Sequence, residues 1–65
     1  MNATETRMFA TLAEATSAAK RAAKESGSDR FISGWKSGEF ELTTRQPYLG
    51  EWWHVYPDGL TIKRG

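Results

Sequence analysis

The sequence predicts a small α+β domain, in which one N-terminal α-helix packs on an antiparallel β-meander of three to five short strands. An alanine-rich segment of helical period fills the first half, and alternating, strand-like segments fill the second half. The length agrees, because 65 residues make one domain near the lower limit of chains that fold alone. We assign residues 8–65 to this domain and expect residues 1–7 to be a disordered N-terminal tail.

The helix is predicted over residues 12–26, after a short strand in the segment RMFAT. Thr11 and Glu14 have the spacing of a capping box, and Gly27 suits the left-handed residue that closes a helix. At 100° per residue, one narrow stripe gathers small residues, namely Leu12, Ala15, Ala19, Ala22, Ala23 and Ser26. Because alanine has little surface to bury, this stripe must lie close against something bulky, which the aromatic-rich second half supplies.

Strands are expected in the segments RFISGW and EFELTTR, which KSG joins with Gly38 free to adopt a positive φ. In the second of these strands Phe40, Leu42 and Thr44 alternate with polar residues and therefore form the inward side. The segment RQPYLG then breaks the pattern before the last two strands, and YPDGL between those strands predicts a hairpin turn.

Two registers compete for that last hairpin. A three-residue loop with a bulge at Gly59 puts Trp52, His54 and Tyr56 on the face of Leu60 and Ile62, which we take to be the inward face. A two-residue turn at Asp58 and Gly59 instead turns Trp53 and Val55 inward. We favour the first register, because proline at the second turn position commonly accompanies a glycine bulge.

Either register leaves one tryptophan on the face away from Leu60 and Ile62. A single helix covers one side of a sheet, so we expect an exposed aromatic cluster on the other side that acts as an interaction surface. The predicted partner-binding residues are Trp52, Trp53, His54, Val55 and Tyr56, with Lys63, Arg45 and Glu51 at the rim. The alternative is that the sheet curls and long side chains cover the rings, which would make the aromatics a means of stabilising a short chain.

The composition argues against metal binding, cofactor binding and catalysis. The chain has no cysteine and a single histidine, His54, so we expect no metal, no cofactor and no enzymatic activity. No apolar run is long enough to span a membrane, which predicts a soluble, cytoplasmic protein. The net charge of +1 is nearly balanced, so a protein partner is favoured, with a homodimer possible. Single-stranded nucleic acid, stacked on aromatics of the sheet, is the alternative partner.

The capped TLAEA helix that leads into a tryptophan-bearing sheet resembles, in general layout, small accessory proteins carried by phages and mobile elements. This resemblance implies a protein that docks on a larger protein or complex and inhibits or modulates it. The functional expectation is therefore a small non-enzymatic protein-binding module.

Overall fold

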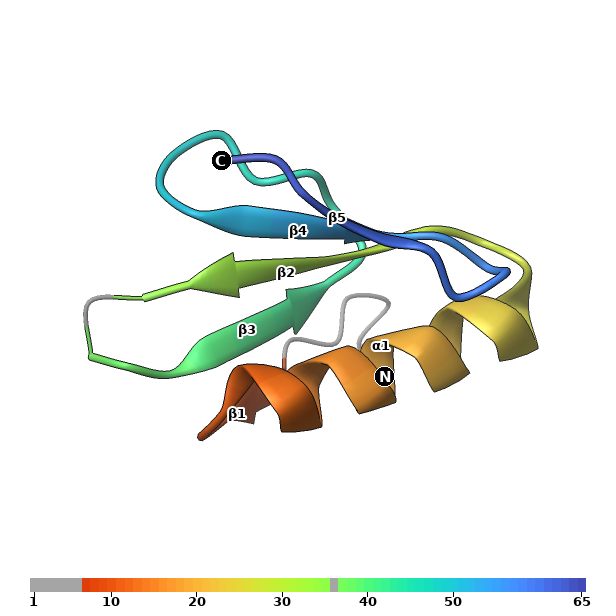
Figure 1. Cartoon of the computed structure of the whole chain (residues 1–65), viewed down its shortest axis with the longest axis horizontal. Helices are drawn as coiled ribbons and strands as arrows, with labels where there is room; N and C mark the ends of the chain where they lie inside the picture. Colours follow the sequence, from red (N-terminus) through yellow and green to blue (C-terminus); the bar gives the residue numbers. More distant parts are fainter. Residues whose placement is uncertain (1–6, 36) are drawn as a thin grey trace, which may run out of the picture.

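The computed structural model describes residues 7–35 and 37–65, and it confirms the predicted α+β class (Figure 1). One helix packs on one sheet, and a short strand precedes the helix as expected. The elements are β1 (Arg7–Phe9), α1 (Leu12–Ser26), β2 (Arg30–Gly34), β3 (Phe40–Thr43), β4 (Trp52–Val55) and β5 (Thr61–Lys63). Residues 1–6 of the predicted tail lie outside the described residues, and Arg7 is the first residue of β1.

The five-stranded sheet has the order β1-β3-β2-β4-β5, and the pairs between neighbours are antiparallel. This order departs from the predicted meander at one place, because β4 pairs with β2 and not with β3. Strands β3 and β4 therefore run in the same direction on either side of β2, and the connection 44–51 must cross over β2 to join them. We refer to residues 44–51 as the crossover loop.

Helix α1 has the predicted bounds and both predicted ends. The Thr11 side chain accepts a hydrogen bond from the backbone N–H of Glu14 at 3.1 Å, which satisfies one of the free donors of the first turn. Gly27 closes the helix in the left-handed conformation with φ of 70°, and its N–H donates to the Ala23 carbonyl at 2.8 Å. Local sequence alone therefore fixes both ends of this element.

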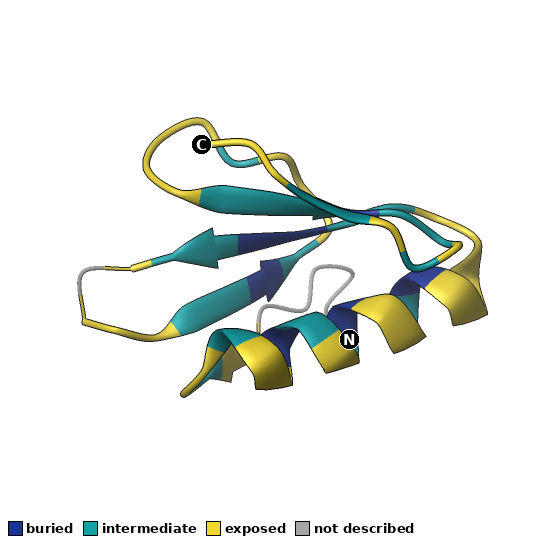
Figure 2. Cartoon of the chain, in the orientation of Figure 1, coloured by how far each residue is buried: buried dark blue, intermediate teal, exposed yellow. Residues whose placement is uncertain are grey.

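The core lies between α1 and the sheet (Figure 2). The small residues of the predicted stripe bring the helix close to the sheet, since Ala15, Ala19 and Ala23 are completely buried. The facing strands supply the larger side chains of Ile32, Leu42 and Val55. Helix α1 packs mainly on β2 and β3, so its contact is centred on the middle of the sheet.

The final hairpin adopts the favoured register. Tyr56 donates its N–H to the Leu60 carbonyl at 2.8 Å, and His54 lies opposite Ile62, as the three-residue loop requires. The inward face was predicted wrongly, however: Val55 is buried under the helix, and the face of Leu60 and Ile62 points away from it. The physical reason is that β5 is an edge strand outside the centre of the helix contact, so its apolar residues do not mark the core side.

Candidate binding surface

The crossover loop partly covers the sheet face opposite α1, which we call the far face (Figure 1). The loop begins at the end of β3 and returns beside β2, where the Glu51 carbonyl accepts a hydrogen bond from the Gly34 N–H at 2.9 Å. Gly50 takes a positive φ of 75° just before β4 begins, which turns the chain back into the sheet. The far face is therefore not a bare sheet surface.

A hollow of about 340 Å³ lies between the crossover loop and the far face. Its floor comes from the strands and the residue that follows β2, and its wall comes from the loop. The lining residues are Ser33, Trp35, Glu41 and Thr43 on the floor, and Arg45, Gln46, Pro47, Tyr48 and Leu49 in the wall. Most of these side chains are polar or aromatic, a mixture typical of recognition surfaces.

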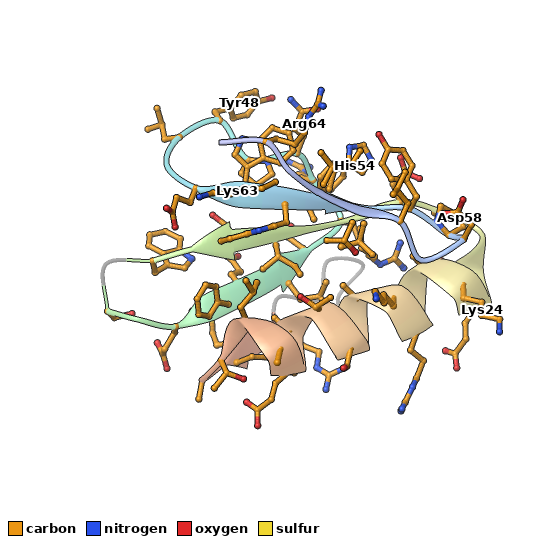
Figure 3. The ribbon with its side chains drawn as sticks, viewed as in Figure 1. Lys24, Tyr48, His54, Asp58, Lys63 and Arg64 are labelled. Carbon is orange, nitrogen blue, oxygen red and sulfur yellow. The ribbon has the colours of Figure 1, made fainter. Side chains whose placement is uncertain are left out.

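The most exposed large apolar side chains of the hollow are those of Trp35, Tyr48 and Leu49. Tyr48 is 93% exposed and Leu49 86% exposed, whereas Trp35 is 55% exposed. Figure 3 places Tyr48 on the side of the sheet away from the helix. Two adjacent large side chains held almost wholly in water contribute little to the stability of the isolated fold, and they form the most exposed apolar part of this face.

Trp35 is exposed but held in place. Its indole Nε1–H donates to the Glu41 Oε1 at 2.8 Å, and its backbone bonds to both Glu39 and Gly38 in the β2–β3 turn. Because the indole donor already has an acceptor, a partner that covers the ring leaves no unsatisfied N–H behind. A rigid ring also loses little conformational entropy when it is covered.

Next to the hollow, four rings pack against one another on the far face, and they come from β2, β4 and the residue that follows β4. The ring centroids of Phe31 and His54 lie 4.6 Å apart, and His54 stacks on Tyr56 at 4.0 Å with an interplanar angle of 5°. Trp52 approaches Phe31 at 6.0 Å, and Gly65 lies directly against the Trp52 ring. These contacts bury Phe31 and leave the other three rings half-buried. The four rings, which we call the ladder, therefore form a small second core.

A side-chain contact that sequence reasoning missed connects this cluster of rings to the segment after α1. The His54 Nε2 lies 2.7 Å from the Asp29 Oδ2, across a sequence separation of 25 residues. Two other carboxylates near the sheet have different partners: Glu41 accepts from the Trp35 indole N–H, and Glu51 pairs with Lys63 at 3.4 Å. His54 therefore holds the segment after α1 against β4.

The predicted site residues separate into three groups. Trp52, His54 and Tyr56 lie on the far face in the ladder, and Arg45 lines the hollow. Trp53 lies on the opposite face, where its ring meets Phe40 edge-on at 5.9 Å, with Lys63 and Glu51 beside it as a surface pair.

Val55 is 0% exposed, so its assignment as a partner-contacting residue was wrong: the same alternation that turns His54 outward turns Val55 into the core. Trp35, Tyr48 and Leu49 are the residues that sequence reasoning missed. A signal for two of them was present, because large apolar residues in a segment without strand alternation fall on a loop, and loops lie on the surface.

The residues that the structure describes include no group of three or more histidine, aspartate or glutamate side chains placed to hold a metal ion. Within the same residues, α1 is neither long enough nor apolar enough to cross a membrane.

No protein-family model, no curated protein and no solved structure matches the chain.

Proposed function

We propose that the protein is a small non-enzymatic protein-binding module that docks on a larger protein or complex through the crossover loop and the hollow beneath it. The consequence of docking would be inhibition or modulation of that larger protein. A cytoplasmic accessory protein of a phage or mobile element is the setting that the general layout of the sequence favours.

The observation that carries this proposal is the exposure of Tyr48 and Leu49 beside the anchored ring of Trp35. Tryptophan and tyrosine carry interface energy more often than most residues, because they combine a large rigid area with one polar group. The predicted anchor, the strand from Trp52 to Tyr56, contributes differently: its rings pack on one another and support the surface from the side.

Stacking of single-stranded nucleic acid finds less support on this face. His54 and Tyr56 each cover one face of the other's ring, which reduces the ring surface of the Trp52–Tyr56 strand on which a base could stack. The exposed residues also include the aliphatic side chains of Leu49 and Leu60, which offer no stacking surface. A protein partner accommodates both kinds of side chain.

The test is capture of partners from a lysate of the source cells by the tagged protein, compared with the double variant Tyr48→Ala, Leu49→Ala. Because both side chains are almost fully exposed, the double variant should melt within a few degrees of the wild-type protein. We expect it to lose the captured protein, whereas Lys24→Ala, on the helix side of the molecule (Figure 3), should retain it. Capture that survives the loop substitutions would refute the proposal. Sedimentation of the wild-type protein at two concentrations then shows whether the captured partner is a second copy.

A further inference from the structure

On the far face, some charged side chains have partners within the fold and others do not. Arg45 lines the hollow, and Figure 3 places Arg64 on the same side of the sheet, away from the helix. Among the residues that the structure describes, neither arginine forms an ion pair with a carboxylate. Arg64 lies close to the crossover loop, because the next residue, Gly65, packs against the Gly50 carbonyl.

Two carboxylates of this part of the molecule already have partners within the fold. Asp29 pairs with His54 at 2.7 Å, and Glu41 accepts the indole N–H of Trp35 at 2.8 Å. A bound partner therefore meets two guanidinium groups with free donors, next to exposed apolar side chains. A guanidinium group presents several N–H donors in a planar fork that matches a carboxylate.

We propose that the hollow binds an acidic segment of a partner protein, with an aromatic or aliphatic side chain against Trp35, Tyr48 and Leu49 and with carboxylates on Arg45 and Arg64. This inference rests on the proposed function and adds to it the chemistry of the partner. Charge complementarity carries the choice of an acidic segment, because the guanidinium donors of Arg45 and Arg64 are free to pair with carboxylates, whereas Asp29 and Glu41 are already hydrogen-bonded within the fold.

The experiment is selection of random dodecapeptides, displayed on phage, against the immobilised full-length protein. We expect the enriched sequences to combine at least two aspartate or glutamate residues with an aromatic residue or leucine. A synthetic peptide of the enriched sequence is then titrated against the wild-type protein and its variants. Arg45→Glu and Arg64→Glu should each weaken binding about three- to tenfold, because each replaces an attraction by a repulsion.

The matched control is Lys20→Glu, which changes the net charge by the same amount on the exposed side of α1. It should leave the affinity for the enriched peptide within about twofold of wild type, because exposed charges far from the site are screened by salt. If Lys20→Glu weakens binding as much as Arg45→Glu does, general charge attraction explains the result and the proposal is refuted.

The other outcomes separate this inference from the proposed function. Enrichment of basic or uncharged apolar peptides that still need Tyr48 and Leu49 would refute the acidic partner and leave the docking surface standing. Failure to enrich any peptide would overturn the acidic-segment proposal, while the lysate capture would still test the docking surface. Saturable binding of a single-stranded oligothymidylate probe that depends on both arginines would contradict a protein partner in favour of nucleic acid.

Discussion

Close contact between α1 and the sheet predicts that Ala19 tolerates neither a larger nor a smaller residue. Ala19 is completely buried in the cluster that contains Ile32, Leu42 and Val55. Leucine at this position inserts an isobutyl group where a methyl group now fills the space, which costs about 1–3 kcal/mol in well-packed cores. Ala19→Gly lowers the free energy of unfolding by about 1 kcal/mol through helix propensity and by about 0.8 kcal/mol through the lost burial of a methyl group.

These losses are large for a chain of this size. A 65-residue domain has a free energy of unfolding of about 3–10 kcal/mol, and 1 kcal/mol lowers the melting temperature by about 4–8 °C. We therefore expect Ala19→Leu to melt about 8–16 °C below the wild-type protein for a loss of about 2 kcal/mol, measured by circular dichroism on heating.

Ala13 provides the matched control, because it is exposed on the same helix. Ala13→Leu should change the free energy of unfolding by less than about 0.5 kcal/mol, since no packing is disturbed. Ala13→Gly should lose the propensity contribution alone, about 1 kcal/mol. Equal stabilities for Ala19→Leu and Ala13→Leu would show that α1 is not closely packed on the sheet at Ala19, which would refute this prediction.

Three further predictions concern the end of α1, the contact between Asp29 and His54, and the two faces of the sheet. Gly27→Ala should cost about 1–2 kcal/mol in urea unfolding, because a Cβ disfavours φ of 70°, and Gly27→Asn should cost less. A double-mutant cycle of Asp29→Ala and His54→Ala should give a coupling of about 0.5–1 kcal/mol, reduced by the exposure of Asp29; additive losses would mean no interaction. Trp53→Ala should cost about 2–4 kcal/mol by thermal unfolding, whereas Tyr48→Ala should cost less than about 0.5 kcal/mol; similar losses would contradict the assignment of the faces.

The features that sequence reasoning predicted correctly depend on local chemistry. Thr11 and Gly27 mark the two ends of α1, and both act through hydrogen bonds to residues within one turn. The loop around Gly59 likewise sets the register of the last hairpin, because a turn aligns the strands that it joins. Such features can be read from a few adjacent residues without knowledge of the rest of the fold.

The features that could not be predicted depend on which distant segments become neighbours. The pairing of β4 with β2 leaves no local mark in either strand, and an eight-residue connection is long enough for either arrangement. The contact between Asp29 and His54 follows from that pairing, which places Arg30 opposite Val55. The inward face of β4 also depends on where the helix lies across the sheet, which the alternation of one edge strand does not reveal.

The crossing over β2 also explains why the exposed aromatics are not the predicted ones. In a meander, β3 and β4 would be adjacent, and the loop between them would project from the end of the sheet. Because the loop instead passes over β2, it carries Tyr48 and Leu49 above the far face and forms the hollow against Trp35. Trp52 then lies beside the crossover loop and packs on Phe31, and this contact leaves Trp52 half-buried. The change in strand order therefore moves the candidate binding surface from the strand to the loop, and this shift makes Tyr48 and Leu49 the residues with which to test it.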